Sequence, residues 1–262
     1  MNLHFYKFQG NGNDFIILDN SSNNISLNTM QINKLCDRRF GIGADGLILL
    51  SPSINYDFGM VYFNSDGNVS SMCGNGGRCI AAFANLRGIV GGKMKFDAYD
   101  GVHEAIIEKE LVTATEWDVS LQLADVSSVD KNDSYYFLNT GSPHYVEFVD
   151  NVLDINMAVE GKKIRISNIF KPDGTNVNFV EIGDDSVFVR TFERGVEAET
   201  LSCGTGVTAS AIAVFLQTGR NKVMVNTKGG NFEISFSYDD NVFTNIWLRG
   251  PATLVFEGNI TV

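Results

Sequence analysis

Two cysteines of this chain share an unusual setting. Cys73 begins the run CGNGG and Cys203 begins CGTGV, so each thiol precedes a Gly-x-Gly sequence. A strand-like, aromatic-rich run comes before each cysteine, and an apolar, alanine-rich run with helical spacing comes after it. This order predicts a thiol at a helix N-terminus, where glycines let the backbone approach a ligand and the helix dipole favours an anion. The dipole also lowers the pKa of a thiol, which prepares it to exchange protons.

Two such thiols could act on one carbon atom. If two helix N-termini held the same carboxylate, the neighbouring carbon would have a sulfur atom on each face. One thiol could then remove a proton while the other returned one, which inverts a stereocentre without a cofactor. We therefore expect Cys73 and Cys203 to be catalytic, and we expect neither a cofactor nor a metal.

Other roles for the cysteines fit the spacing less well. A tyrosine-phosphatase loop needs five residues between Cys and Arg, whereas four separate Cys73 from Arg78, and a nucleotide P-loop would end in Gly-Lys-Ser/Thr. No CxxC or HxxxH spacing supports zinc. A glycine-rich helix entrance is also poor core material, and here it occurs twice. Cys36 and Cys79, in contrast, fall within helical apolar patterns and are expected in the core.

The two motifs belong to an internal repeat with an offset of 130 residues. Asp14 and His144 each lie 59 residues before their motif cysteine. After each predicted helix, alternating strands around a glycine predict a hairpin, and a further short helix is expected over 29–40. The sequence therefore predicts an α+β fold of two pseudo-symmetric halves, each a mostly antiparallel or mixed sheet wrapped around a central helix. The active site is expected in the cleft between them.

The expected domain boundaries follow from the repeat. The first half would comprise residues 1–117 and 250–262 and carry Cys73, and the second would comprise residues 118–249 and carry Cys203. The terminal segment is assigned to the first half because terminal strands often close a sheet.

Composition limits the partners. The chain has 262 residues and a formal net charge of −11, which disfavours binding to nucleic acid or an anionic membrane. No apolar run approaches the roughly 18 residues of a membrane span, and the first residues lack the pattern of a secretion signal. Four cysteines are too few for a disulfide scaffold. We expect a cytoplasmic protein with a small-molecule substrate, and the sequence leaves a homodimer open.

Several further motifs make the chain resemble one family along essentially its whole length. The residues that carry the resemblance are GNGNDF (10–15), GIGADG (41–46), YFNSDG (62–67), MCGNGGRC (72–79), GSPH (141–144), TNVNFV (175–180), ERG (193–195) and CGTG (203–206). Together they are similar to diaminopimelate epimerases. The resemblance implies an isomerase that interconverts LL- and meso-2,6-diaminopimelate without pyridoxal phosphate or metal, in lysine and peptidoglycan precursor synthesis.

The resemblance also implies roles for individual residues. Cys73 and Cys203 become the acid and base, and Arg194 becomes a bidentate partner of the distal carboxylate. His144 and Glu193 match residues close to the thiols that could tune a pKa or contact the substrate. Asp14 is expected to be a turn or capping carboxylate. The substrate-binding residues implied are Asn13, Asn64, Gly74, Asn75, Asn176, Glu193, Arg194, Gly204 and Thr205.

Two positions depart from the family's pattern. Ser142 stands where the family more often has Asn, and Gly46 stands where some members have Gln. A different cofactor-free racemase, acting on proline or hydroxyproline, would share the two thiols but hold a single carboxylate. A thiol-redox or small-molecule binding protein would need one reactive cysteine or none. Arg194 and the asparagines favour a substrate with a second carboxylate, and the duplicated motif disfavours the redox reading.

Overall fold

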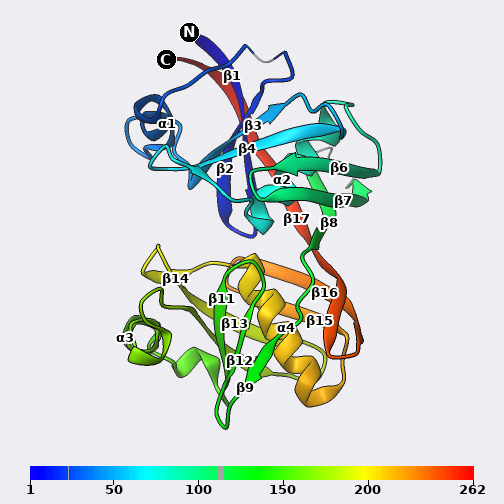
Figure 1. The fold of residues 1–262 in the computed structure, drawn as a ribbon. Coiled ribbons are helices and arrows are strands. Elements are labelled where there is room, and N and C mark those ends of the chain that lie inside the picture. The colour runs from blue at the N-terminus through cyan, green and yellow to red at the C-terminus, as the bar shows by residue number, and fades with distance from the viewer. Residues whose placement is uncertain (23, 111–114) are drawn as a thin grey trace. The chain divides into compact units, whose positions relative to one another are not determined.

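The computed structural model describes residues 1–22, 24–110 and 115–262. The chain forms two compact units, Met1–Leu121 with Gly250–Val262, and Gln122–Arg249. The chain leaves the first unit within β8 (Glu116–Leu123) and returns to it within β17 (Val242–Thr261). Both strands can be followed by colour in Figure 1. The last residues of β17 pair with β1, with Thr253 opposite Gln9 and Thr261 opposite Asn2.

The first unit is a mixed sheet with two helices. Its remaining elements are β1 (Asn2–Gly10), β2 (Asn13–Asp19), α1 (Thr29–Cys36), β3 (Gly46–Ser51), β4 (Phe58–Asn64), β5 (Val69–Ser70), α2 (Gly74–Leu86), β6 (Lys93–Ala98) and β7 (Gly101–Glu110). Pairing is antiparallel except between β2 and β3 and between β4 and β6. Helix α1 begins at a capping box, because Asn28 and Gln31 each accept the other's backbone N–H.

The second unit repeats this order. Its elements are β9 (Val129–Lys131), β10 (Tyr136–Asn139), β11 (Pro143–Phe148), η1 (Val152–Asp154), α3 (Met157–Arg165), η2 (Asn168–Phe170), β12 (Asn176–Ile182), β13 (Val187–Glu193), β14 (Ala198–Thr200), α4 (Gly204–Thr218), β15 (Lys222–Thr227) and β16 (Gly230–Asp239). Here the parallel pairs are β11 with β12 and β13 with β15, at the same places in the order as in the first unit. The predicted α+β class and internal repeat are confirmed.

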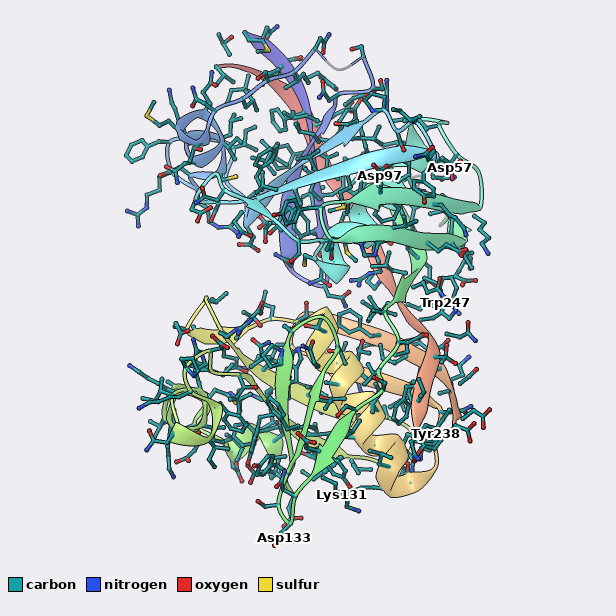
Figure 2. The ribbon with its side chains drawn as sticks, in the orientation of Figure 1. Asp57, Asp97, Lys131, Asp133, Tyr238 and Trp247 are labelled. Atoms are coloured by element: carbon teal, nitrogen blue, oxygen red, sulfur yellow. The ribbon has the colours of Figure 1, made fainter. Side chains whose placement is uncertain are left out.

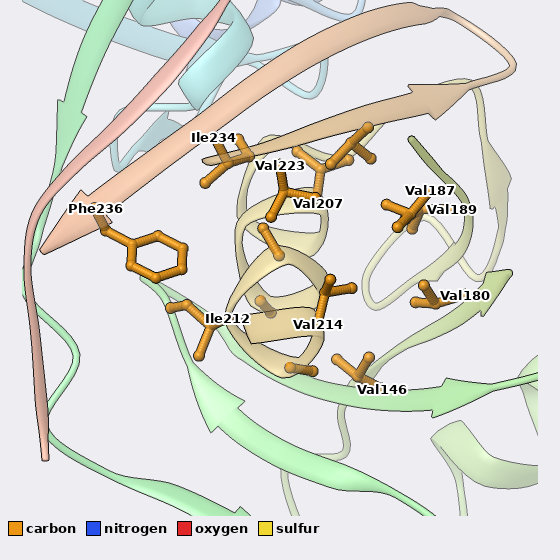
Figure 3. Packing of buried hydrophobic residues seen from close by; sticks show 14 of the residues in the cluster. Val146, Val180, Val187, Val189, Val207, Ile212, Val214, Val223, Ile234 and Phe236 are labelled. Atoms are coloured by element: carbon orange, nitrogen blue, oxygen red, sulfur yellow. The ribbon is translucent and has the colours of Figure 1, made fainter. Parts of the chain in front are cut away.

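Helix α4 is the centre of the second unit. Its sequence is apolar on all sides, which suits a helix enclosed by strands rather than one lying on a surface. Figure 3 shows Val207, Ile212 and Val214 of α4 among side chains from the surrounding strands, including Val146, Val180 and Ile234. All six are fully buried, and each such side chain contributes about 1.5–3 kcal/mol through removal from water. The packing fixes the helix and therefore the position of its first turn.

Glycines end the central helices and form the hairpins, as predicted. Gly219 follows α4 in the left-handed region with φ 77°, a conformation that costs glycine little. In the first unit Gly88 has φ 66°, two residues after α2 ends. The hairpins after these helices close with Gly101 opposite Ala98 and Gly230 opposite Thr227.

The side chain of Asp57 lies at the end of the β4–β6 pair. The side chain of Asp57 accepts the backbone N–H of Lys95 at 2.8 Å, just before the parallel register of Gly59 with Asp97. Asp57 and Asp97 are drawn at this edge in Figure 2. The pairing orders the segment that follows α2.

One element was not anticipated from the sequence. Helix α3 occupies the place in the second unit that α1 occupies in the first, between the second and third strands of the repeat (Figure 1). Only Met157 and Gly161 of α3 are buried, so its sequence carries almost no apolar stripe. Gly161 is needed for the contact, because a Cβ there would lie 2.6 Å from Cβ of Phe192.

Candidate active site

Both motif cysteines are helix N-caps. Cys73 precedes α2 with φ −95° and ψ 134°, and Cys203 precedes α4 with φ −132° and ψ 111°. Each cysteine carbonyl accepts the first intrahelical bond, from Gly77 at 2.7 Å and from Val207 at 2.9 Å. The backbone N–H groups of the first turn are not used within a helix and can receive an anion. The predicted placement of both thiols at helix N-termini is confirmed.

In the first unit, Cys73 lies beside Asn13 of β2. The Sγ atom is 3.5 Å from Oδ1 of Asn13, which also accepts a hydrogen bond from Nδ2 of Asn75 at 3.3 Å. Nδ2 of Asn13 donates to Oδ2 of Asp45 at 2.7 Å. Since a carboxylate only accepts, this bond fixes the amide with its oxygen toward the thiol. The structure therefore brings the sequence-predicted residues Asn13, Cys73 and Asn75 together.

Asn75 is itself held by a buried guanidinium. Nη2 of Arg78 donates to Oδ1 of Asn75 at 2.9 Å and to Oδ1 of Asn11 at 2.7 Å. Arg78 is fully buried, and burial lowers its pKa to about 10. A positive charge therefore lies under the first turn of α2. The equivalent residue of the second unit is the neutral Thr208, which donates to the carbonyl of Gly204 at 2.9 Å.

Asp14 caps a loop, as expected, because its Oδ1 accepts the backbone N–H of Asp45 at 3.1 Å, and it also carries an ion-pair network that the sequence did not predict. It lies on β2, where Nζ of Lys7 is 2.7 Å from Oδ2 and Arg38 donates to both carboxylate oxygens. Burial acts to raise the pKa of Asp14, but the hydrogen bonds and charges of Arg38 and Lys7 outweigh it and hold the pKa well below its usual range. Arg38 also donates to Asp45 at 2.7 Å, so this ion-pair network continues to Asn13.

In the second unit, a group of buried and half-buried polar side chains lies beside Cys203. Sγ is 3.4 Å from Oγ1 of Thr205, and that hydroxyl is 2.9 Å from Nε2 of His144 and 3.2 Å from Oγ of Ser142. His144 is fully buried. Burial, followed by the positive charge of Arg194, lowers the pKa of His144 to about 3, so the imidazole is neutral. His144 reaches Cys203 through Thr205.

Asn176 connects this group to Arg194. Its Oδ1 accepts the backbone N–H of Arg194 at 2.8 Å, and its Nδ2 donates to Ser142 at 3.0 Å and to the carbonyl of Pro143 at 3.1 Å. Arg194 and Glu193 stand at the end of β13, both half-buried, and Nη1 of Arg194 lies 3.5 Å from the carbonyl of Asp173. His144, Asn176, Arg194 and Thr205 therefore form one connected cluster in the second unit.

Asn64 and Gly46 lie opposite each other in the first unit. Asn64 ends β4 with an exposed side chain, and its register partner is Gly46 of β3. A Cβ at position 46 would lie 2.5 Å from the ring of Tyr62 and 2.5 Å from the carbonyl of Phe63. The aromatic ring excludes any longer side chain there, which explains why glycine occupies this position.

Several residues of the site were missed by the sequence reasoning, namely Arg38, Asp45, Arg78 and Asn178, together with the side chains of Ser142 and Thr205. The sequence did contain one signal for Asn178. Asn176 and Asn178 are two apart at the start of a strand whose other residues, apart from Glu181, are apolar, so both side chains point to the same face.

The other two cysteines are core residues, as predicted. Cys36 and Cys79 are 3% and 0% exposed, and burial raises their pKa values to about 11 and about 12. In the described residues, no group of three or more His, Cys, Asp or Glu side chains is placed to hold a metal ion. None of the helices in that same part of the chain has the length and apolar character needed to cross a membrane.

The fold itself recurs in solved structures. A phenazine biosynthesis protein of the PhzF family from Bacillus anthracis superposes with a TM-score of 0.77 over 100% of both chains at 13% identity. A hydroxyproline epimerase from Agrobacterium vitis, with bound trans-4-hydroxy-L-proline, superposes with a TM-score of 0.68 over 99% of this chain and 92% of that one at 12% identity. At these identities the likeness concerns the fold alone. It places this chain in the class of duplicated α+β proteins built around two central helices.

Sequence comparison identifies the family within that class. The diaminopimelate epimerase family model matches residues 5–116 and 136–255. Diaminopimelate epimerase from Flavobacterium psychrophilum is 51% identical over 98% of this chain and 100% of its own length, and that from Chlorobaculum tepidum is 41% identical over 97% and 99%. The chain belongs to the diaminopimelate epimerase family.

Proposed function

We propose that this protein interconverts LL- and meso-2,6-diaminopimelate, with Cys73 and Cys203 exchanging protons at one α-carbon. The observation that carries the proposal is the duplicated N-cap cysteine, one at the start of each central helix. The family membership supports the substrate and the isomerase class.

The reaction requires an acid and a base of matched strength. One thiolate removes the α-proton, and the other thiol delivers a proton to the opposite face, so each turnover exchanges the protonation states of the two sulfur atoms. In this proposal the α-carboxylate is held by the backbone N–H groups of Gly74, Asn75, Gly204 and Thr205. Helix N-termini favour the negative charge that develops on the substrate when its α-proton leaves.

The distal end of the substrate must be held differently from the reacting end. We assign its carboxylate to Arg194, whose planar guanidinium can bind a carboxylate through two hydrogen bonds. Asn13, Asn64, Asn176 and Glu193 complete the proposed binding set. Asn176 supports the assignment, since it fixes the backbone of Arg194 on one side and Ser142 on the other.

The direct test is hydrogen exchange. Diaminopimelate incubated with the purified protein in heavy water, without pyridoxal phosphate, should gain deuterium at one α-carbon while the LL and meso forms equilibrate. Proline and hydroxyproline serve as comparison substrates. Exchange of those compounds but not of diaminopimelate, or a requirement for added pyridoxal phosphate, would reject the proposal.

The proposal extends to the cellular compartment and the oligomeric state. The reaction is assigned to the cytoplasm, where the four cysteines, which form no disulfide in this structure, would stay reduced. A homodimer is proposed because Val255 and Phe256 of β17 are 54% and 47% exposed, an apolar pair that a second copy could cover. Sedimentation of the wild type beside a Val255→Lys variant tests this assignment, and a monomeric wild type would reject it.

A further inference from the structure

The side chains behind Cys203 form a hydrogen-bonded chain whose direction can be worked out. It runs from Asn178 through His144 and Thr205 to Sγ of Cys203. Asn178 and His144 are both fully buried. Because each hydroxyl has one proton to donate, the direction of the chain decides whether Thr205 can donate to the sulfur.

Asn178 sets the first step. Its Nδ2 lies 2.8 Å from the carbonyl oxygen of Tyr145 and 3.1 Å from Nδ1 of His144. A carbonyl oxygen only accepts, so the amide nitrogen must occupy this side, and Oδ1 accepts from the hydroxyl of Thr191 at 2.9 Å on the other. Nδ1 of His144 is therefore an acceptor. A neutral imidazole that accepts at Nδ1 carries its proton on Nε2.

The charge state of His144 agrees with this direction. Burial lowers its pKa to about 3, and the next contribution is the positive charge of Arg194. The side chains within hydrogen-bonding distance of its ring nitrogens are uncharged amides and hydroxyls, namely Ser142, Asn176, Asn178 and Thr205. The ionisable side chains at this end of β13 are those of Glu193, its last residue, and of Arg194, which follows it.

Thr205 is the next step. Nε2–H of His144 donates to Oγ1 of Thr205 at 2.9 Å, so the hydroxyl proton of Thr205 points elsewhere. Ser142 and Cys203 are the remaining neighbours, at 3.2 Å and 3.4 Å. Oγ of Ser142 already accepts from Nδ2 of Asn176 at 3.0 Å. A thiolate is a charged acceptor and competes for the proton better than a neutral hydroxyl does.

We propose that the hydroxyl of Thr205 donates to Sγ of Cys203 and stabilises its thiolate, and that His144 acts as a positioning residue that keeps this hydroxyl turned toward the sulfur. The inference rests on the proposed function for its catalytic meaning. It gives Thr205 a side-chain role besides the backbone role expected from the sequence. It also gives Ser142 a role, as a second hydroxyl that shares Nε2–H of His144.

The first unit provides a natural comparison. The residue equivalent to Thr205 is Asn75, which donates from Nδ2 to Oδ1 of Asn13 at 3.3 Å. The atom beside Sγ of Cys73 is that amide oxygen, an acceptor. Substitutions of the Thr205 side chain should therefore change the pKa of Cys203 and leave the pKa of Cys73 unchanged.

Alkylation measures this directly. The free protein is treated with iodoacetamide across a range of pH, and the modified peptides containing Cys73 and Cys203 are quantified separately. In Thr205→Val, the pKa of Cys203 should rise by about one unit, the effect of one hydrogen bond to a charged group. Thr205→Ser should restore the wild-type value, and the pKa of Cys73 should not change in either variant. The proposal would be overturned if the pKa of Cys203 were unchanged in a folded Thr205→Val protein, or if the pKa values of both thiols shifted equally.

The wild-type protein gives a second test that needs no variant. The chain has three histidines, so nitrogen NMR of the uniformly labelled protein can assign the tautomer of each. His144 should carry its proton on Nε2 and keep it without change down to mildly acidic pH. A proton on Nδ1 would reverse the direction of the hydrogen bonds between Asn178 and Cys203 and refute the inference. Both tests omit diaminopimelate, so they stand or fall separately from the proposed epimerisation.

Discussion

Asn13 donates from Nδ2 to Oδ2 of Asp45 over 2.7 Å, and this bond turns the amide oxygen of Asn13 toward Cys73. Removing the acceptor in Asp45→Ala should free the amide to rotate. We expect kcat to fall by a few-fold to about tenfold, the effect of one hydrogen bond. Unfolding should change little, since the Asp45 side chain is 45% exposed.

Asp45→Asn is a second test of the same bond. Arg38 can only donate, so it should hold the oxygen of the new amide, and an NH2 group then replaces the oxygen that accepts from Asn13, so activity should fall as it does in Asp45→Ala. Steady-state kinetics and thermal unfolding of both variants decide the matter. Equal activity of Asp45→Ala and the wild type would show that the orientation of Asn13 does not matter.

Gly206, the second glycine of CGTG, leaves room for Asn178, the first member of the hydrogen-bonded chain that ends at Cys203. A Cβ there would lie 2.5 Å from Oδ1 of Asn178 and 3.2 Å from Oγ1 of Thr191. Gly206→Ala should therefore displace Asn178, lower activity strongly and cost about 1–3 kcal/mol of stability through overpacking. Gly92→Ala is the control, because a Cβ there meets nothing within 4 Å. Chemical denaturation and kinetics should separate the two variants, and similar results for both would contradict the packing argument.

The sequence predicted the repeat, the central helices and the N-cap cysteines, because these features are encoded locally. Alternating strands, glycine stops and alanine-rich runs can be recognised within a short window. Helix α3 escaped prediction because so little of its surface is apolar.

The roles of the polar residues of the site could not be predicted from local sequence. Asn178 and Asp45 act through partners 34 and 32 residues away. Their roles depend on how strands align, and no local pattern specifies that. The resemblance supplied the residues that are expected to contact substrate, and the structure supplied their hydrogen-bonding partners.

Arg194 offers a test of how the distal carboxylate is held. Arg194→Lys keeps the positive charge and the backbone bond to Asn176 but loses the planar fork. We expect KM for diaminopimelate to rise by about tenfold or more, which corresponds to the loss of one charge-assisted hydrogen bond. Initial-rate kinetics with both isomers measure it. An unchanged KM would assign the distal carboxylate to another residue.

His144 should make the fold sensitive to acid. Its pKa is about 3 in the folded protein against about 6.5 for an unperturbed histidine, so below about pH 6.5 the unfolded chain takes up a proton that the folded chain does not. The free energy of unfolding should therefore fall with falling pH, by up to about 1.4 kcal/mol per unit for this one group.

Urea unfolding between about pH 6.5 and 5 tests this dependence, in a range above the pH at which the depressed pKa of Asp14 begins to matter. His144→Gln should flatten the dependence, whereas His4→Gln, at an exposed site, should not. If the three proteins have the same slope, His144 is not the group responsible.

The central claim is that two thiols, one from each unit, share one proton transfer. The most direct measurement is the epimerisation rate of Cys73→Ala, Cys203→Ala and the double variant, with Cys36→Ala as a control for loss of a buried thiol. Each single variant should lose at least about 10²–10⁴ in rate, the range for one general acid or base, and the double variant should be little worse. Near-normal epimerisation by either single variant, in protein shown to be folded, would contradict the account.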